Sequence, residues 1–494
     1  MADYKHGAYG AIQSVGTRVA DTSRCAIVYI GTAPVHNIEG GAKNVNVPMV
    51  VNNIADARRL FGYSDEWDKY TLCEAMHVHL ENKGVAPLIF INVLDPAKHK
   101  TTEAGTVSKT PENGRIVIPA AQDIILDTVT VKSGSTAKVK GKDYAISYNI
   151  DKKTMTIAEL TSGALGSAAL TITYSTIDAT EVENADVIGT TDGLGANTGL
   201  YAVSSVYQMT GYIPAYIAAP GFSSVPEIHG ALVKNATKIN GHWDAYLFAD
   251  LPLVDNATPL TLETVKTFKE SNGYENENET VFFPMAQGVD GKKYHLSVLA
   301  AANFQALLLE NSGIPYKTAS NTECALIENL YLGENATGRV YDDSTINEKL
   351  NKNGIASAAY VGGRWAIWGC HSADYNQDNN DSINVSETNR MMLYYLSNDF
   401  QHRRAGNVDK PMTRNDLQSI RAEEQQRLDA LLNIGALTYG NVVLNAEATV
   451  GSDIMNGDFS FVFDITTTPL ARSLTAIVNW TDEGFTTYYE NLLA

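Results

Sequence analysis

Cysteine is scarce in this sequence, with four residues in a chain of 494. Cys25, Cys73, Cys324 and Cys370 lie far apart and form no Cys-x-x-Cys pair. A disulfide framework or a zinc site needs sulfur ligands at closer, patterned spacing. We therefore expect four buried thiols of a cytosolic protein, without a disulfide framework or a metal ion.

Long apolar runs are also absent. The most apolar helical stretch runs from Leu296 to Leu309, is interrupted by Asn303 and Gln305, and is too short to span a bilayer. At the start of the sequence, no charged region leads into an apolar core, so no signal peptide is expected. The sequence predicts no direct contact with a membrane.

Basic residues are outnumbered by acidic ones. The chain has 37 Lys and Arg against 56 Asp and Glu, which gives a formal net charge of -19. Such a surface repels the phosphates of nucleic acids, and no dense basic run offsets it. We expect no direct nucleic-acid partner, and we expect the charge to keep free subunits apart before any assembly.

Sequence motifs of nucleotide-binding sites are missing or incomplete. No GxxxxGK[ST] loop occurs. The run Gly193–Gly199 is close to a dinucleotide-binding fingerprint, but it follows the polar residues Thr190–Asp192 instead of a strand. A pyrophosphate needs the start of a helix directly after a strand. The run is interpreted as a flexible joint, and no cofactor is predicted.

Metal-binding and hydrolytic motifs are no better supported. Asp374–Asp381 has the alternating ligands of a calcium loop, but Asn379 replaces the turn glycine and Val385 the terminal glutamate. His77 and His79 are two apart, so they do not share a helix face. Neither HExxH nor GxSxG occurs. No catalytic residue and no metal ligand is predicted, although a catalytic triad assembled only by the fold stays an alternative.

Short apolar runs alternate with helical patterns in the first part of the chain. Strands are predicted at Cys25–Gly31 and Leu88–Val93, because near-continuous apolar runs are typical of strands buried on both faces. Helices are predicted over Ile54–Phe61, with Asn53 as the N-cap, and over Trp67–Asn82. This order is an α/β unit.

The composition becomes rich in Thr, Ser and Gly between residues 101 and 190. Short alternating runs separated by polar turns indicate a small β-sandwich or barrel inserted into the α/β frame. The predicted strands are Arg115–Ile118, Thr128–Lys132, Tyr144–Tyr148, Thr154–Ile157 and Leu170–Tyr174.

The α/β pattern resumes from residue 201 to 368 and is followed by an α+β region. The predicted helices are Val225–Ile239, Thr258–Ser271, Tyr294–Asn311, Glu387–Phe400 and Thr413–Asn433. The predicted strands are Tyr212–Ala219, Asp244–Ala249, Val281–Phe283, Trp365–Trp368, Phe459–Ile465 and Thr475–Trp480. The predicted domains are an arm at 1–19, an α/β segment at 20–96, the insert at 97–192, an α/β domain at 193–370, an α+β core at 371–483 and an arm at 484–494.

The two chain ends carry tyrosines and other apolar residues in segments with little core of their own. Tyr side chains are favoured at interfaces because they bury a large area at low entropic cost. We therefore predict contacts with other subunits through both arms. The predicted contact residues are Tyr9, Ile12, Val15, Phe485, Tyr488 and Tyr489.

Six short stretches, in this order along the chain, resemble the contractile tail sheath family, particularly sheaths of Gram-positive phages and R-type bacteriocins. They correspond to the amino-terminal arm, the first core strand, the end of the next helix, the strand that closes the α/β domain, and the carboxy-terminal core and arm. The stretches are His6–Tyr9, Ile27–Ala33, Leu60–Gly62, Gly363–Gly369, Thr468–Leu474 and Trp480–Phe485.

The resemblance implies an α/β and α+β multidomain protein. The implied domains are a subtilisin-like α/β domain without a catalytic triad, an inserted β-sandwich and an α+β core, together with extended terminal arms. It implies a structural subunit, made in the host bacterial cytoplasm, that polymerises around an inner tail tube as stacked hexameric rings. Contraction of this sheath would drive the tube through a target envelope. The implied partners are further copies of the chain and the tube, baseplate and tail terminator proteins of a virion or phage-tail-like particle. An α/β hydrolase-like enzyme with a β accessory domain is the alternative.

Overall fold

The computed structural model describes residues 25–101, 105–334, 341–377, 383–445 and 451–493. The predicted contact residues Tyr9, Ile12 and Val15 lie outside these ranges. The chain forms two compact units, Met1–Thr413 (unit 1) and Arg414–Ala494 (unit 2), which are described separately.

Unit 1 is built on an eight-stranded sheet with the order β2-β3-β1-β11-β12-β15-β19-β20. The pairs from β3 to β19 are parallel, while β2 and β20 add antiparallel strands at the two edges. Parallel strands are covered on both faces, which explains their near-continuous apolar sequences. The strands are β1 Cys25–Gly31, β2 Met49–Val51, β3 Leu88–Asn92, β11 Ile213–Ala218, β12 Tyr246–Asp250, β15 Glu279–Phe282, β19 Ile355–Val361 and β20 Arg364–Trp368.

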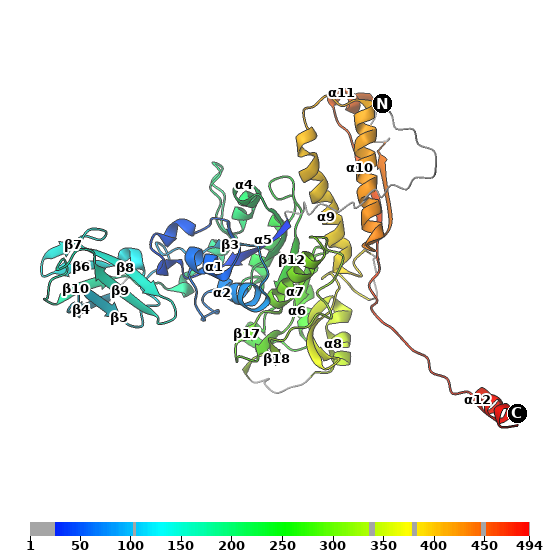
Figure 1. The fold of residues 1–494 in the computed structure, drawn as a ribbon, viewed down its shortest axis with the longest axis horizontal. Helices are drawn as coiled ribbons and strands as arrows, with labels where there is room; N and C mark the ends of the chain where they lie inside the picture. The colour runs from blue at the N-terminus through cyan, green and yellow to red at the C-terminus, as the bar shows by residue number, and fades with distance from the viewer. Residues whose placement is uncertain (1–24, 102–104, 335–340, 378–382, 446–450, 494) are drawn as a thin grey trace, which may run out of the picture. The chain divides into compact units, whose positions relative to one another are not determined.

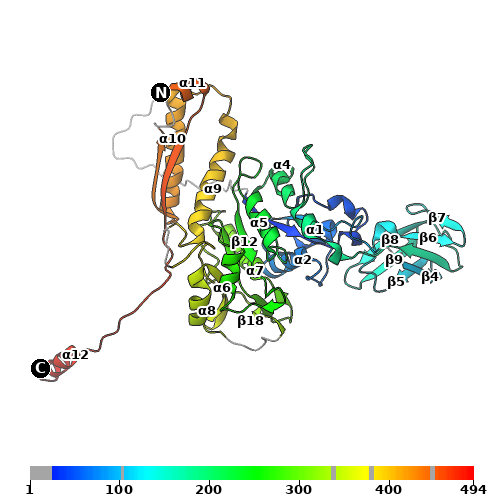
Figure 2. The same cartoon turned by 180° about the vertical axis from the view of Figure 1, so that it is seen from behind.

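Helices pack against this sheet (Figures 1 and 2). They include α1 Ile54–Phe61, α2 Thr71–Ala75, α5 Pro226–Asn235, α6 Val265–Ser271, α7 Leu296–Glu310, α8 Asp343–Lys349 and α9 Glu387–Arg404. The side chain of Asn53 accepts a hydrogen bond from Asp56 N, so the predicted cap of α1 is confirmed. Most of α7 is buried, as expected of a helix that is apolar on nearly all sides. No helix among the described residues is long and apolar enough to cross a bilayer.

Several predicted helices differ from the structure, and the one expected over Val225–Ile239 ends at Asn235. The helix expected from Thr258 begins only at Val265, because Thr258–Pro259 (β14) pairs with Val254–Asp255 (β13). The helix expected over Trp67–Asn82 is α2 followed by a π-helix, η3 Met76–Lys83. Helix α9 extends to Arg404.

Helix α9 was expected to belong to the carboxy-terminal core but packs within unit 1. The side-chain amide of Asn398 donates to Asp244 O at 2.8 Å and its oxygen accepts from Asp244 N at 3.1 Å. Glu387 accepts a hydrogen bond from Thr280 on β15. These buried polar contacts fix the helix to the sheet, so the boundary between the compact units falls after it, at Thr413.

The segment between β3 and β11 contains two small sheets with a core of their own. One has the order β4-β10-β6-β7 and the other β5-β9-β8. Side chains from both sheets, such as Val131, Ile157 and Ile172, meet in one buried cluster. The strands are β4 Gly105–Lys109, β5 Arg115–Ile118, β6 Thr130–Ser133, β7 Thr136–Lys138, β8 Tyr144–Asn149, β9 Thr154–Glu159 and β10 Leu170–Tyr174. Strands β4 and β7 were not predicted, because they are short and largely exposed.

Unit 2 consists of a long helix, a hairpin and a tail. Helix α10 (Arg414–Asn433) packs on β21 (Leu437–Leu444), which pairs antiparallel with β22 (Phe461–Thr467). The short helix α11 (Gly451–Asn456) precedes β22, and helix α12 (Glu483–Leu493) ends the described chain. The strand predicted at Thr475–Trp480 is not formed: residues 468–480 are neither helix nor strand, and they pair with no strand of the described residues.

Candidate assembly segments and a closed polar cluster

The tail of unit 2 exposes most of its large apolar side chains. Leu474, Ile477, Val478 and Trp480 are 81–90% exposed in a segment without regular structure. Apolar side chains at such high density are unfavourable in water unless they are covered by another surface. The segment therefore has the properties of a chain that is completed by a partner.

The predicted contact residues of the carboxy-terminal arm lie on a helix instead of an extended strand. Phe485, Tyr488 and Tyr489 are on α12 and are 58%, 63% and 63% exposed. With Leu492 and Leu493 they follow the spacing i, i+3, i+4, i+7, i+8, which places five apolar side chains on one helix face. The expectation of an extended arm is wrong here, because Gly484 was read as an exit from structure and this spacing was overlooked.

Along one edge of the hairpin of unit 2, backbone groups of β21 are hydrogen-bonded by side chains of α10. Gln425 of α10 donates to Gly440 O at 3.1 Å and accepts from Val442 N at 2.9 Å, and Arg421 donates to Val442 O at 2.9 Å. Gly440 eases the close approach of α10, since a Cβ there would lie 3.1 Å from Leu428 Cβ, which is tighter than an ordinary contact. Side chains of α10 thus satisfy the backbone of β21 on the side away from β22.

A buried polar cluster lies where the parallel strands end. In sheets of this kind ligands bind at the carboxyl ends of the strands, where the order of winding reverses. Here β3 and β11 flank β1, so the reversal lies at β1 and β11. Glu74 of α2, Asp250 at the end of β12, and His295 just before α7 meet near this edge.

The cluster is closed by its own hydrogen bonds. His295 Nδ1 lies 2.6 Å from Glu74 Oε2, while Ser297 N and Oγ both donate to the carboxylate of Asp250. Ser223 Oγ accepts from Asp250 N at 3.0 Å. Ser297 therefore bonds the carboxylate of Asp250 and Ser223 its backbone N–H, while the imidazole of His295 bonds Glu74. This arrangement is an ion pair with supporting hydrogen bonds, and it does not place a hydroxyl for attack by general-base catalysis.

Burial and the neighbouring charged side chains shift the pKa values of His295 and Asp250. Burial alone would lower the pKa of His295, but the carboxylates of Glu74 and Asp250 outweigh it and raise the pKa to about 9. Burial raises the pKa of Asp250. No local sequence pattern indicates this cluster, because its members are far apart along the chain and meet only in the folded sheet.

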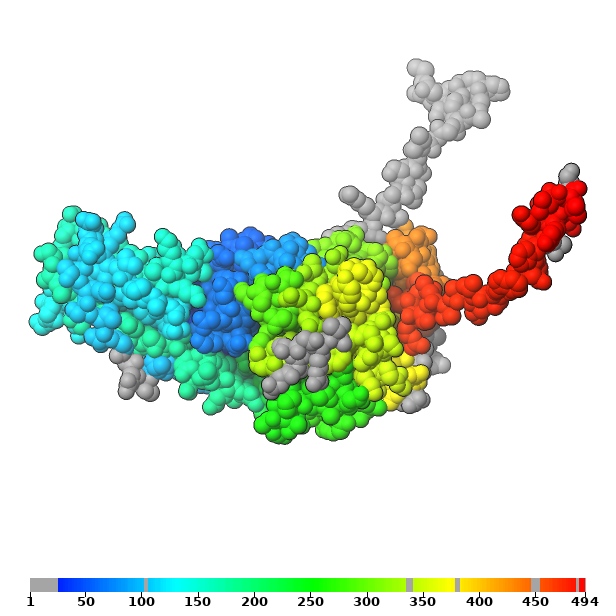
Figure 3. All heavy atoms as spheres, turned by 90° about the horizontal axis from the view of Figure 1, so that it is seen from below, coloured from blue at the N-terminus to red at the C-terminus, as the bar shows by residue number. Residues whose placement is uncertain are grey.

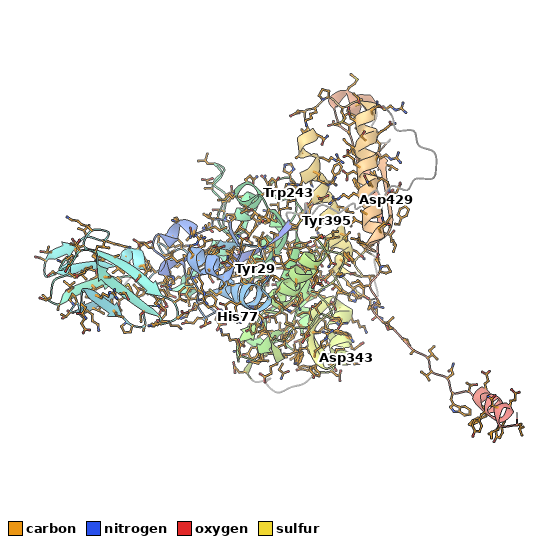
Figure 4. All side chains as sticks on the ribbon, viewed as in Figure 1. Tyr29, His77, Trp243, Asp343, Tyr395 and Asp429 are labelled. Carbon is orange, nitrogen blue, oxygen red and sulfur yellow. The ribbon has the colours of Figure 1, made fainter. Side chains whose placement is uncertain are left out.

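The glycine-rich loop at Gly193 and the histidines at 77 and 79 make hydrogen bonds within the fold. In the loop at Gly193, the carboxylate of Asp192 accepts from Leu194 N and Ala196 N, so these amides are already bonded. His79 bonds Tyr29 in the core at 2.7 Å, while His77 bonds Glu81 at 2.9 Å (Figure 4 labels Tyr29 and His77).

Neither the possible calcium loop nor the cysteines form a metal site among the described residues. Part of the loop at Asp374 lies outside the described residues. In the described ranges, no three His, Cys, Asp or Glu side chains are grouped to hold a metal ion. Cys73 and Cys324 are buried, but Cys25 and Cys370 are partly exposed, so the expectation of four buried thiols is right for two.

Comparison with known proteins identifies similar chains. No protein-family model matches the sequence. A tail sheath protein of Burkholderia phage BcepMu is 28% identical over 258 residues, which cover 51% of this chain and 50% of that protein. The matched region thus spans about half the length of this curated relative.

Solved structures extend the likeness to nearly the whole fold. A chain of the anti-feeding prophage baseplate matches with a TM-score of 0.55 and 13% identity, covering 98% of both chains. A chain of the PVC sheath complex, from an extracellular contractile injection system in the contracted state, matches with a TM-score of 0.54 and 9% identity, covering 98% of this chain and 99% of that one. The resemblance to tail sheath proteins is confirmed, and this mixed α/β multidomain chain has the fold of contractile sheath proteins.

Proposed function

We propose that this protein is the structural subunit of a contractile tail sheath, which polymerises around an inner tube and contracts to drive the tube through a target cell envelope. The observation that carries the proposal is the exposed apolar tail at 474–480, followed by the apolar face of α12, on a chain with the fold of sheath proteins. A subunit that functions alone has no use for such a tail, whereas a polymer covers it at every repeat.

The tail acts as a linker in this proposal. Residues 468–482 can span up to about 50 Å when extended, which is enough to reach a neighbouring subunit. Residues 474–480 add as a strand to a neighbour's sheet by main-chain hydrogen bonds, each worth about 0.5–1.5 kcal/mol net. The apolar face of helix α12 is then buried against the same neighbour that receives the strand.

The hairpin of unit 2 does not accept this strand along β21, because α10 already bonds the β21 backbone at Gly440 and Val442. The amino-terminal arm, with Tyr9, Ile12 and Val15, makes a second link of this kind. Links through the terminal arms allow subunits to move as rigid bodies during contraction without separating.

The finer assignments follow the same proposal. Residues 193–370 form a subtilisin-like domain without a catalytic triad, and the insert is a β-sandwich. We take its role to be structural and not catalytic, because Ser297, two residues after His295, donates its hydroxyl to Asp250. It forms stacked hexameric rings in a phage virion, a tail-like bacteriocin or another contractile injection particle, where it contacts the tube, baseplate and tail terminator proteins.

Electron microscopy of the purified chain, alone and co-expressed with the tube protein encoded beside its gene, tests the proposal. We expect rings or tubes of constant width, and sheathed tubes when both proteins are present. A chain that stays monomeric with and without the tube protein would contradict the proposal.

A further inference from the structure

The β insert meets the α/β frame of unit 1 at a junction that combines polar contacts with a cavity. The cavity has a volume of about 320 Å³ and is lined by residues of both parts. Across the junction, the carboxylate of Asp127 accepts a hydrogen bond from Gly40 N at 3.0 Å, and Asp151 Oδ1 lies 3.8 Å from Arg58 Nη1. Figure 3 shows the surface of the insert (cyan) meeting the surface of the first segments of the described chain (blue). Because the insert has a hydrophobic core of its own, it would stay folded if these contacts opened.

His36 makes a buried hydrogen bond from the frame to the insert. It lies in the short helix η1 (Val35–Asn37) and is 2% exposed. Its Nε2 lies 2.8 Å from the backbone oxygen of Gln122, at the base of the insert. A carbonyl oxygen only accepts, so Nε2 carries the hydrogen and donates it. The geometry thus fixes the tautomer of the neutral imidazole.

The other ring nitrogen of His36 has no hydrogen-bond partner among the described residues. Nδ1 is buried, and in the neutral ring it is an acceptor. When the ring is protonated, Nδ1 becomes a second N–H donor, and it would then be both charged and unsatisfied. Burying such a cation is far less favourable than burying the neutral ring. The docked junction therefore holds His36 in its neutral form.

Titratable groups near His36 are neutral or already paired. The ring of Tyr70 lies 5.9 Å from the imidazole, and burial raises the pKa of its phenol far above the ordinary value, so it carries no charge. The carboxylates of Glu39 and of Asp127 lie 3.2 and 3.6 Å from Lys140 Nζ. Because this lysine compensates both, they offer little stabilisation to a protonated His36.

Asp123, which follows Gln122, acts in the opposite sense. Burial raises the pKa of its carboxyl, while Lys69 and Lys153 lower it. A carboxyl whose pKa is raised in the docked state is easier to protonate there, so acid strengthens docking at this residue. Any weakening of the junction in mild acid therefore comes from His36 and not from Asp123.

The strength of this effect follows from the pKa of His36. Burial lowers the pKa from 6.5 to about 4, and the bond to Gln122 offsets this only in part. In the released state the imidazole meets water and regains its ordinary pKa. Docking is therefore at full strength above pH 6.5 and weakens as the pH falls toward 4. With a fully solvated imidazole in the released state, the docking constant falls about 30-fold between pH 8 and pH 5.

We infer that His36 is an acid-sensitive latch between the frame and the insert. Protonation of this one imidazole breaks the balance of the junction and frees the insert to move on the frame as a folded body. The only ligand required is a proton. This inference does not depend on assembly and can be tested on the purified subunit.

A thiol at position 125 reports release of the insert. Ile125 belongs to the insert, yet it is 3% exposed and packs in the core of the frame. In Ile125→Cys, labelling by a dipyridyl disulfide is followed by mass spectrometry, peptide by peptide, and each rate is divided by that of the urea-unfolded chain at the same pH. Cys73, which is buried in the frame, is the internal reference for opening of the frame itself. We expect the rate at position 125 to rise about 30-fold from pH 8 to pH 5, without a matching rise at Cys73.

Two histidine variants in the Ile125→Cys background assign the effect. His36→Gln can still donate to Gln122 O but does not titrate in this range, so its labelling should lose the acid response. His242→Gln, at an exposed histidine, is the matched control and should keep the response. No rise at position 125, an equal rise in His36→Gln, or a parallel rise at Cys73 would overturn the inference. If His36→Gln does not fold, histidine C2–H exchange in the original chain decides, and a His36 pKa at or above the ordinary 6.5 would overturn it.

Discussion

Both oxygens of the Glu74 carboxylate are bonded by His295, which donates its backbone N–H to Oε1 at 2.6 Å and has Nδ1 2.6 Å from Oε2. Glu74 is 1% exposed, and 18% of the His295 side chain is exposed. The pair joins α2, near β1, to the start of α7. It occupies the sheet edge where related α/β folds bind ligands, and there it makes a structural link.

The first prediction is that His295 makes the stability of unit 1 depend on pH. The folded pKa of about 9 lies above the ordinary value of 6.5. The stabilisation is therefore fully present below pH 6.5 and is lost as the pH rises through 9. This loss amounts to at most about 3 kcal/mol. Urea unfolding followed by tryptophan fluorescence between pH 7 and 10 measures it, because four of the five tryptophans lie in unit 1.

The variant for this prediction is His295→Gln. It should be less stable at pH 7 by about 3 kcal/mol, because buried carboxylates lose their cation, and its stability should change less toward pH 10. His242→Gln, at an exposed histidine, is the matched control. Equal pH dependence in the original chain and in His295→Gln would contradict the assignment.

The second prediction concerns catalysis. Ser297 Oγ donates to Asp250, so it is not activated by an imidazole. An active-site serine probe of the fluorophosphonate type should not label the protein, and broad esterase and peptidase substrates should stay intact. Stoichiometric labelling of any one serine, lost in its alanine variant, would instead support the hydrolase alternative.

Much of the α/β frame could be predicted from the sequence because its signals are local, but β2 and β19 were missed. Parallel strands buried on both faces read as apolar runs, and Asn53 marks the start of α1. The cluster of Glu74, Asp250 and His295 could not be predicted, since only the order of strands in the sheet brings these residues together. The π-helical form of η3 also has no known local signal, and its sequence reads as an ordinary helix.

The carboxy-terminal end shows a different kind of error. The spacing of Phe485, Tyr488, Tyr489, Leu492 and Leu493 was visible in the sequence and predicts an amphipathic helix. The alternation at Thr475–Trp480 was read as a strand, but a strand needs a partner. Within this chain residues 468–480 form no strand, which fits a segment completed by another subunit.

The third prediction is that the insert can be removed without unfolding the frame. Thr101 N donates to Thr176 O at 2.9 Å, and the two hydroxyls lie 2.8 Å apart, so the ends of the insert are adjacent. Replacing residues 102–175 by Gly-Ser-Gly-Ser should therefore leave the ends unstrained. Ile125 contributes to the frame core, and Gln122 O bonds His36 at 2.8 Å. Their loss should lower stability by roughly 2–5 kcal/mol.

Circular dichroism and thermal melting of the shortened chain measure this outcome. We expect a cooperative transition at a lower temperature and sheaths that still form at least in part. A milder variant, Asp127→Ala, removes the acceptor of Gly40 N and an ion pair of 3.6 Å with Lys140, and it should melt close to the original chain. Complete misfolding of the shortened chain would show that the insert is part of the core.

The last prediction separates the tail from the folded units. Truncation after Asp482 removes α12, whose apolar side chains are exposed, so unit 1 and the α10 hairpin should keep their circular dichroism and melting. The double variant Leu492→Asp, Leu493→Asp keeps the chain length but charges the apolar face. Burying each leucine is worth about 1.5–3 kcal/mol, so association should weaken at least about 100-fold. Sedimentation should then show monomers, and microscopy should show no sheathed tubes. Glu490→Gln, on the polar face of α12, is the matched control and should assemble normally. Sheaths of normal length from the truncated chain would show that α12 is dispensable and that subunits are joined through other surfaces.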